Sequence, residues 1–281
     1  MTGKTRTDYM QMFAADGTVL LHPERPESKY RPLNALRNFQ KLMKDKEDTA
    51  AVFKIFESLP SKDFMPRIAA LALSEQGEHL RRSEPWLPEI LDDHDALRRT
   101  PKGSLAHAYC DFMEAEGLSA AGLVAESDRA GLPRYPDLVE WYINRSRDTH
   151  DLFHILTGYG RDALGEASVL LFTHGQQPSQ GHLLIGYAGA ANIKKMAKGT
   201  KAPVFGAVRE AHRTGKGAPQ LIAQPIRELL ARPLADVRAE MRIPEPVKYR
   251  ECHRIWREEG INPYNLLASR ETAEQPELLA A

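Results

Sequence analysis

The amino-acid sequence predicts an all-α protein, and three observations support this prediction. Apolar residues recur every three or four positions through most of the 281-residue chain, which is the spacing of a helix face. Alternating apolar and polar runs are nearly absent, and Thr18–Leu21 is the one short run with the character of a strand. The composition, 42% hydrophobic and 27% charged, is typical of a folded globular protein. We therefore expect a single-domain helical bundle.

The predicted bundle lies between two less regular ends. Residues 1–30 are polar and form an N-terminal extension, whereas residues 31–245 carry the helical periodicity. Residues 246–281 are expected to hold one C-terminal helix, followed by a frayed tail after Ser269. The first helices of the bundle are predicted at Pro32–Lys46, Ala50–Leu59 and Asp63–Leu73.

The remaining helices follow a polar connection. The segment 75–102 contains prolines and mixed charges, so we expect a long connection with one short helix at Pro88–Leu91. A run of Lys, Gly and Ser at 102–104 then opens a helix that ends at Gly117. Later helices are predicted at Ser119–Glu126, Asp137–Thr157, Asp162–Phe172, Gly181–Met196, Val204–Arg213, Ile222–Ala231, Leu234–Met241 and Pro246–Glu259.

Charge and cysteine content exclude several kinds of protein. The chain has 38 basic and 38 acidic residues, so its net charge is zero and we expect no nucleic-acid partner. Cys110 and Cys252 are too few for a disulfide framework or a four-thiolate zinc site, and they suit a reducing compartment. No apolar run approaches the roughly eighteen residues of a membrane span. Residues 1–17 lack the apolar core of a secretory signal, so we expect a cytoplasmic protein.

The segment Arg147–Tyr159 contains the residues with the most distinctive chemistry. His150 and His154 are four positions apart, so both imidazoles lie on one face of a helix, one turn apart. Asp151 lies about 100° around the helix from His150 and can reach a shared point. The residues between them are apolar, which indicates a buried helix. A buried carboxylate beside two imidazoles needs compensation, and a divalent cation supplies it.

A second carboxylate completes the predicted ligand set. Glu166 follows His154 after eleven intervening residues, beyond a glycine turn at Gly158–Gly160. This turn allows the next helix to fold back antiparallel and to direct Glu166 toward the histidines. The sequence therefore predicts one divalent ion between two adjacent helices. Its predicted ligands are His150, Asp151, His154 and Glu166.

Other kinds of protein use similar residues. A histidine pair at helical spacing is often only solvated or hydrogen-bonded. Zinc proteases use His-Glu-x-x-His, whereas Asp151 is one methylene shorter than that Glu. A His-Asp phosphohydrolase needs a further histidine upstream, for which His79, His94 and His107 are available. The two Glu-x-x-His units of a di-iron bundle are absent, but a two-histidine, one-carboxylate set typical of non-haem iron is present.

The motif resembles that of the fourth protein of the coenzyme Q (ubiquinone) biosynthesis set. The signature of that family is His-Asp-x-x-His, eleven intervening residues and Glu, and the four predicted ligands fill all of its places. Arg147 before the motif and Leu164–Glu166 at its end agree with the family pattern. Weaker matches extend the resemblance over residues 30–245, and Tyr249–Asn265 continues past the usual end of the family.

The resemblance implies a chemistry and a cofactor. The four motif residues would be both metal ligands and catalytic residues. The implied reaction replaces the carboxylate at ring carbon one of a polyprenylated quinone head-group precursor by a hydroxyl, an oxidative decarboxylation performed by a lyase or an oxidoreductase. The implied cofactor is one divalent metal ion, most often zinc, with iron, manganese, cobalt and magnesium as alternatives. An alternative function is a non-catalytic, lipid-binding scaffold that organises the other ubiquinone biosynthesis proteins.

The resemblance also implies a homodimer and peripheral attachment to a membrane. The location would be the inner face of a bacterial membrane, or the mitochondrial inner membrane if a presequence has been removed. The sequence contains a segment suited to such a surface, because an apolar helix is followed by a strongly basic stretch. The residues expected at the lipid or membrane surface are Leu183, Leu184, Ile185, Lys194, Lys195 and Lys198. A solvated helix face or a tight helix contact is the alternative for this segment.

Three residues next to the motif are expected to orient the metal ligands without binding the ion themselves. Arg147 and Asp148 precede the histidines, and Tyr159 follows them within the glycine turn. Groups that hydrogen-bond to metal ligands fix their orientation and affinity. Ordinary charge at a helix end or on the surface is the alternative interpretation of these residues.

Overall fold

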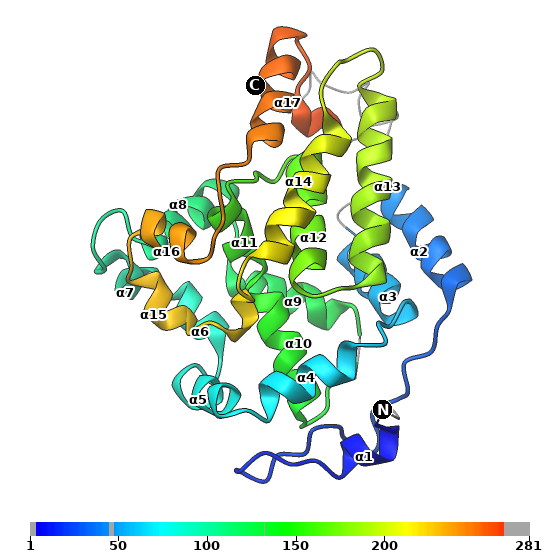
Figure 1. Ribbon diagram of the computed structural model, residues 1–281, viewed down its shortest axis with the longest axis vertical. Coiled ribbons are helices and arrows are strands. Elements are labelled where there is room, and N and C mark those ends of the chain that lie inside the picture. Colours follow the sequence, from blue (N-terminus) through cyan, green and yellow to red (C-terminus); the bar gives the residue numbers. More distant parts are fainter. Residues whose placement is uncertain (1–3, 45–47, 132, 267–281) are drawn as a thin grey trace. The chain divides into compact units, whose positions relative to one another are not determined.

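Helices form the regular secondary structure in the part of the chain that the structure describes. The computed structural model describes residues 4–44, 48–131 and 133–266, which form helices joined by turns (Figure 1). The run expected as a short strand contributes only one isolated bridge, between Phe13 and Val19. The all-α prediction is therefore confirmed. Among the described helices, none combines the length and apolar character that a membrane crossing requires.

The chain forms two compact units, each assembled from three separate stretches. The predicted divisions at residues 30 and 245 stay predictions, and the predicted tail after Ser269 lies outside the described residues. The first unit comprises the described residues of Met1–Lys29, Pro60–Ile155 and Gln220–Val237. The second comprises those of Tyr30–Leu59, Leu156–Pro219 and Arg238–Ala281.

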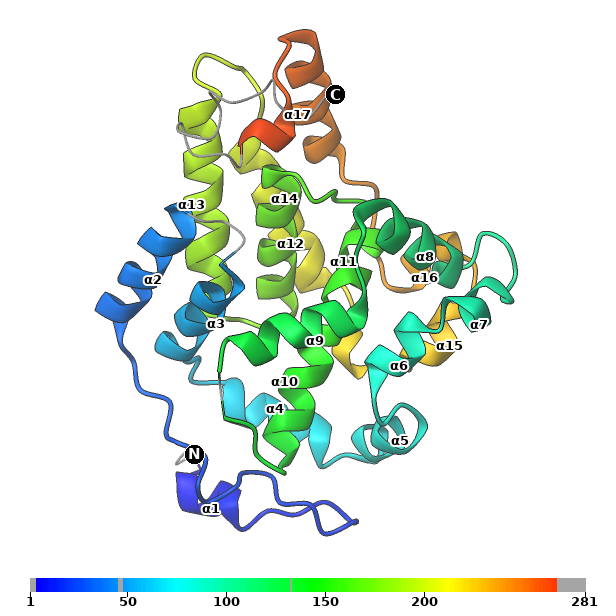
Figure 2. The ribbon, with the colours of Figure 1, turned by 180° about the vertical axis from the view of Figure 1, so that it is seen from behind.

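The first unit is built from short helices. A core around the fully buried Ile68 and Leu80 joins α1, α4, α5, α10 and η1, and Figure 2 shows α4 beside α10 within this unit. The helices that lie in this unit or begin in it are α1 (Arg6–Met10), α4 (Phe64–Ala72), α5 (Glu75–Ser83), α6 (Leu87–Asp92), α7 (His94–Arg98), α8 (Leu105–Glu116), α9 (Ala120–Arg129), α10 (Leu138–Asp148), α11 (His150–Thr157), η1 (Leu221–Ala223), α15 (Ile226–Leu230) and α16 (Leu234–Glu240).

The connection predicted over residues 75–102 is wrong in one respect, because this segment forms three short helices rather than one. Ser74 caps α5 by accepting a hydrogen bond from the backbone N–H of Gly77 at 3.0 Å. Asp93 caps α7 in the same way, accepting from the N–H of Ala96 at 2.9 Å. Capping groups stabilise helices that are too short to show a clear apolar period.

The single helix predicted over Asp137–Thr157 is also wrong, because the structure divides it into α10 and α11. Thr149 lies at the break with φ −89° and ψ 0°, and its hydroxyl donates to the carbonyl of Arg145 at 2.9 Å. A threonine hydroxyl that bonds to a helix carbonyl competes with the helical hydrogen bonds and bends the chain. The break makes His150 the first residue of α11.

The second unit is organised around α12 (Ala163–Gln176), most of whose side chains are buried. Helices α2 and α3 lie beside α13 (Figure 2), and side chains of the three helices pack around the buried Ile55. The other elements of this unit are α2 (Pro32–Lys44), α3 (Thr49–Ser58), α13 (Gln180–Met196), α14 (Val204–Gly217), α17 (Val247–Glu258) and η2 (Pro263–Leu266).

Helix α12 packs unusually closely on α14 because glycine removes side-chain bulk at the contact. A Cβ atom at Gly215 would lie 2.1 Å from the carbonyl oxygen of Phe172. A Cβ atom at Gly175 would lie 2.5 Å from the carbonyl oxygen of His212. Backbones approach this closely only where one residue has no side chain. These contacts fix the position of α12, the helix that carries Glu166, within the second unit.

Replacing Gly215 by alanine is expected to lower the free energy of unfolding by about 2 kcal/mol or more, because the new methyl group must displace the backbone of α12. Unfolding in urea measures this change. Gly217 is a matched control in the last turn of the same helix, since no atom lies within 4 Å of its Cβ position. Gly217→Ala should be neutral or stabilise by up to about 1 kcal/mol. Equal effects of the two substitutions would contradict the packing argument.

Candidate metal centre

The paired histidines lie on one face of α11, as the sequence predicts. The ring centroids of His150 and His154 are 5.2 Å apart and the rings meet edge to face at 78°. His154 is 2% exposed, and its ring stacks on Phe112 of α8 with centroids 5.5 Å apart and an interplanar angle of 22°. His150 is half-buried at the start of the helix. The first unit thus holds two imidazoles one turn apart, the deeper of them fixed by an aromatic ring.

The apolar character predicted for this helix is confirmed. Leu152 is 0% exposed and Phe153 is 2% exposed, so the sides of α11 away from the histidines are covered. His154 on the same helix is 2% exposed, so an ion bound to its imidazole would be shielded from solvent.

Asp151 is half-buried, and its charge acts on Tyr109 of α8. Burial and, after it, the charge of Asp151 raise the pKa of Tyr109. Among the residues that the structure describes, Asp151 belongs to no group of three His, Cys, Asp or Glu side chains that are close enough to share an ion. Its role as a ligand therefore stays a prediction. Within the described part of the chain, none of His79, His94 and His107 groups with the histidine pair, although a His-Asp phosphohydrolase would need such a histidine.

Glu166 belongs to the second unit, in the first turn of α12. Its side chain is 31% exposed, and one of its oxygens lies 3.7 Å from Nε of Arg161. A carboxylate in this position is favoured by the positive end of the helix dipole. Gly165 allows the preceding turn to fold tightly against the helix, since a Cβ atom there would lie 1.8 Å from the carbonyl oxygen of Gly160.

The start of α12 is held by a buried carboxylate. Asp162 accepts hydrogen bonds from the backbone N–H groups of Leu164 at 3.0 Å and Gly165 at 3.3 Å. Its other oxygen accepts from the hydroxyl of Tyr249 and lies 3.3 Å from Nε2 of His253. Burial would raise the pKa of Asp162, but the contacts with His253 and Tyr249 outweigh it and lower the pKa. The carboxylate is therefore kept charged where it caps the helix.

Helix α17 supplies the two residues that contact Asp162, and sequence reasoning assigned no role to them. The hydroxyl of Tyr249 also accepts a hydrogen bond from the N–H of Gly160 at 2.9 Å, so one side chain ties the glycine turn to the helix cap. Tyr159 packs edge-on against this tyrosine, with ring centroids 5.2 Å apart. No local sequence pattern indicates this network, because Asp162 and Tyr249 are 87 positions apart in the sequence.

Replacing Tyr249 by phenylalanine is expected to lower the free energy of unfolding by about 2 kcal/mol, because it removes a hydrogen bond to a buried carboxylate. Unfolding in urea measures the change. Tyr30 is a control in the same unit, with 59% of its surface exposed, and Tyr30→Phe should change stability by less than about 0.5 kcal/mol. The Asp162 network would have no stabilising role if the two variants unfolded alike.

Arg147 and Asp148 are buried rather than part of the surface. Nε of Arg147 donates to Asp148 at 2.8 Å, and both side chains are less than one-tenth exposed. Burial raises the pKa of Asp148 to about 6, although Arg147 acts in the opposite direction. The guanidinium also lies over the ring of Trp86, 5.7 Å from its centroid. These two side chains are therefore not ordinary surface charges. Their predicted role in orienting the metal ligands stays a prediction.

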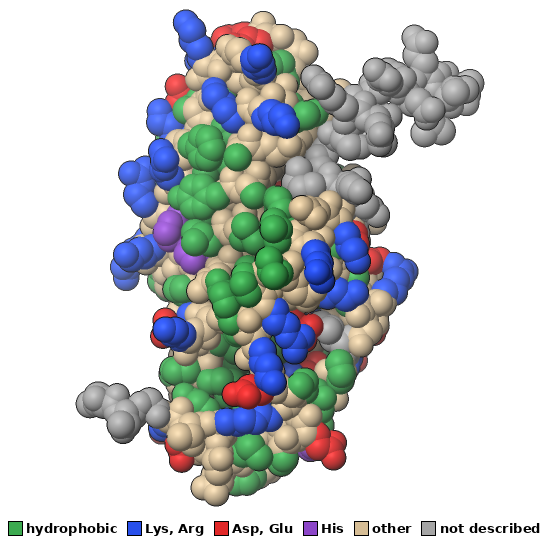
Figure 3. All heavy atoms as spheres, turned by 90° about the vertical axis from the view of Figure 1, so that its right-hand side faces the viewer, with side chains coloured by type: hydrophobic (Ala, Val, Ile, Leu, Met, Phe, Trp, Pro, Cys, Tyr) green, Lys and Arg blue, Asp and Glu red, His purple; other side chains and the backbone are tan. Residues whose placement is uncertain are grey.

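Some of the residues predicted to lie at a lipid surface are packed in the core, and others are exposed. Leu184 and Ile185 pack against the core of α2 and α3, whereas Leu183 is 37% exposed. The three predicted lysines are exposed, and Nζ of Lys194 donates to the carbonyl of Thr200 at 2.8 Å. Figure 3 shows hydrophobic side chains gathered on one face of the molecule, with Lys and Arg side chains beside them.

Comparison with known proteins identifies the family. The family profile described as "Coenzyme Q (ubiquinone) biosynthesis protein Coq4" matches residues 61–247. Two relatives are each named ubiquinone biosynthesis protein COQ4, mitochondrial. The one from Arthroderma otae is 28% identical over 200 residues, which cover 69% of this chain and 70% of the relative. The one from Podospora anserina is 27% identical over 216 residues, which cover 75% of this chain and 67% of the relative.

A solved structure shares the fold. It is a chain from Nostoc punctiforme PCC 73102, provisionally named as a ubiquinone biosynthesis protein. It superposes with a TM-score of 0.58 at 20% sequence identity, over 77% of this chain and 100% of its own length. The profile match spans well over half of the sequence, and it includes α11 and the start of α12. This chain belongs to the Coq4 family of coenzyme Q (ubiquinone) biosynthesis proteins.

Proposed function

We propose that this protein binds one divalent ion through His150, His154 and Glu166, with Asp151 beside them, and uses it in the synthesis of the ubiquinone head group. The observation that carries this proposal is the pair of imidazoles one turn apart on a buried helix. Glu166, in the first turn of α12, is the carboxylate proposed to join them, which would give a ligand set of two nitrogens and one carboxylate. Such a set suits zinc or iron(II) and leaves positions open for a substrate.

Two further observations fit a bound ion and substrate. Five residues connect the end of α11 to the start of α12. This short connection limits how far Glu166 can lie from the two histidines. The hydroxyl of Tyr109 is fully buried and has no hydrogen-bond partner in the described structure. A buried hydroxyl without a partner costs free energy, which a ligand oxygen would recover.

The proposed reaction replaces a ring carboxylate by a hydroxyl. Carbon dioxide leaves, one oxygen atom is added, and the ring precursor loses two electrons to an oxidant such as dioxygen. A bound divalent ion would act as a Lewis acid for the carboxylate and the adjacent phenol oxygen. The unpartnered hydroxyl of Tyr109 could donate a hydrogen bond to a substrate oxygen. We propose that Asp151, which is half-buried on α11, accepts a phenol proton.

A turnover assay with the purified protein tests this function. The protein is incubated with a carboxylated polyprenyl precursor under air and without oxygen, and hydroxylated product is followed by mass spectrometry. The expected result is product formation that stops when the divalent ion is removed with a chelator and returns when it is added back. Failure of the isolated, metal-loaded protein to form product under either atmosphere would contradict the enzymatic function.

A lipid-binding scaffold is the second candidate, and an exposed apolar surface in the second unit supports it. Leu33 and Leu36 of α2 are 71% and 48% exposed, and Tyr30 before them is 59% exposed. Leu183 of α13 adds to the exposed apolar side chains of this unit; Lys194 and Lys195 lie in the last turn of the same helix, and Lys198 follows just after it. Apolar side chains with neighbouring lysines suit an anionic membrane surface.

Binding to vesicles tests the membrane part of this proposal. Sedimentation with vesicles that contain anionic lipid should recover the protein, and Leu33→Asp with Leu36→Asp should weaken binding by about tenfold or more. Phe13 is a control from the first unit that is 59% exposed, and Phe13→Asp should bind as the unchanged protein does. Equal binding by all three proteins would exclude α2 from the membrane surface.

Membership of this family also supports proposals about partners and location. We propose a homodimer that works with other ubiquinone biosynthesis proteins at a membrane surface. The relatives from Arthroderma otae and Podospora anserina are named mitochondrial, which supports a mitochondrial location for this proposal. Light scattering of the purified protein measures the oligomeric state.

A further inference from the structure

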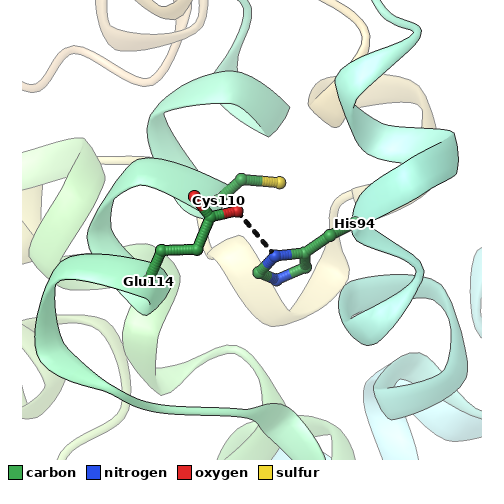
Figure 4. A group of neighbouring side chains, drawn as sticks. All are labelled: His94, Cys110 and Glu114. Atoms are coloured by element: carbon green, nitrogen blue, oxygen red, sulfur yellow. Dashed lines mark hydrogen bonds and ion pairs between the residues drawn. The ribbon is translucent and has the colours of Figure 1, made fainter.

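A second group of possible metal ligands lies within the first unit, on α7 and α8. A ring nitrogen of His94, Sγ of Cys110 and a carboxylate oxygen of Glu114 all lie within 4.8 Å of one another. Figure 4 shows the imidazole facing the other two side chains, which extend from a single helix. Cys110 and Glu114 are four positions apart and thus one turn apart on the same face of α8.

The separation of the nitrogen and oxygen atoms already suits one ion. Nδ1 of His94 lies 3.1 Å from Oε1 of Glu114. Two such ligands bound to a tetrahedral zinc ion at about 2.0–2.2 Å lie about 3.3 Å apart. An ion could therefore replace this hydrogen bond with little movement of either side chain. The thiol completes the set with a soft ligand that zinc binds well.

Arg98 of α7 orients the carboxylate instead of occupying the site. Its Nη2 donates to Oε2 of Glu114 at 2.8 Å, which leaves Oε1 directed at His94. Its Nη1 donates to Asp111 at 2.6 Å, so the guanidinium is held by two carboxylates. Groups that bind the outer oxygen of a ligating carboxylate in this way fix its direction and raise affinity for the ion.

We propose that His94, Cys110 and Glu114 form a second divalent-metal site, for zinc or an ion of similar softness, with water as the fourth ligand. Binding deprotonates the thiol of Cys110, which is fully buried, and replaces its proton by the metal. The ion would join α7 to α8, the helix whose Phe112 stacks on His154. This site does not depend on the proposed function.

Titration of the purified full-length protein with cobalt(II) tests the site. Cobalt bound to a thiolate produces a ligand-to-metal charge-transfer absorption in the near ultraviolet, which the unchanged protein should show. Cys110→Ser should abolish this band. Cys252 is the matched control, because it is also a buried free cysteine, and Cys252→Ser should retain the band. Absence of the band from the unchanged protein, or its persistence in Cys110→Ser, would overturn the proposal.

A second variant covers the case in which Cys110→Ser fails to fold. The side chain of His94 is 27% exposed at a helix start, so His94→Gln should fold and should bind cobalt at least about tenfold more weakly. His154→Ala should leave the band unchanged, which separates this site from the proposed catalytic ion. Zinc content after dialysis should fall by one ion per chain in His94→Gln. Unchanged zinc content and unchanged cobalt affinity in this variant would reject the site.

Discussion

Replacing His154 by alanine is expected to release the ion proposed for α11 and to lower formation of hydroxylated product by about 100-fold or more. His154 is the most deeply buried of the proposed ligands, at 2% exposure, so solvent cannot replace its nitrogen readily. Its loss also leaves His150 and Glu166 without the buried nitrogen donor of the proposed set. Metal analysis of the purified variant measures the first effect, and the turnover assay measures the second.

The control for this prediction is a histidine in the same unit. His79 of α5 belongs to neither candidate ligand group, and His79→Ala should keep both the ion and the activity. Alanine at position 154 also leaves a cavity beside Phe112, so circular dichroism must show that the variant is folded. His154→Gln preserves more of the volume and should lose the ion as well. Full metal content with normal turnover in either variant would rule out the proposed ligand set.

The sequence predicted much of the fold because several helices bury a full apolar period. The helices α2, α3 and α4 lie close to the predicted ranges, and each presents apolar residues at helical spacing. The prediction failed where structure depends on single polar groups. Thr149 ends α10 through its hydroxyl, and Ser74 and Asp93 start short helices by capping them. Such bonds leave no periodic signal.

The candidate site was predictable only as far as it is local in sequence. The spacing of His150 and His154 places both imidazoles on one helix face, and the structure confirms this. The contact of Tyr249 with Asp162 depends instead on tertiary packing, since these residues are 87 positions apart. The burial of Arg147 and Asp148 could likewise not be predicted from the sequence, because charged residues that are adjacent in a sequence commonly lie on the protein surface.

Removing the charge of Glu84 is expected to produce the largest loss of stability in the first unit. Glu84 lies 2.8 Å from Nη2 of Arg145, and their side chains are 1% and 2% exposed. Replacing one member of a buried ion pair leaves the other charge without compensation, which costs about 3–5 kcal/mol. Glu84→Ala should therefore lower the free energy of unfolding by about this amount, as measured by unfolding in urea.

The surroundings of this pair explain why relaxation cannot recover the loss. Arg145 also donates to the carbonyls of Ile222 at 2.7 Å and Gln224 at 2.6 Å, so its guanidinium is fixed in place. The other oxygen of Glu84 accepts from the backbone N–H of Arg227 at 2.6 Å. The pair thereby joins α10 to the segment around η1 and α15. Burial already lowers the pKa of Arg145, although Glu84 acts in the opposite direction.

The exposed pair of Arg254 and Glu258 on α17 provides the comparison. Both side chains are about 60% exposed (60% and 61%), and Nη1 of Arg254 lies 2.8 Å from a Glu258 oxygen. Water and salt screen such a pair, so Glu258→Ala should cost less than about 0.5 kcal/mol. Combining Glu84→Ala with Arg145→Met should restore part of the lost stability, since no uncompensated charge stays buried. If the double variant is no more stable than Glu84→Ala, the backbone hydrogen bonds of Arg145, rather than its charge, hold these segments together.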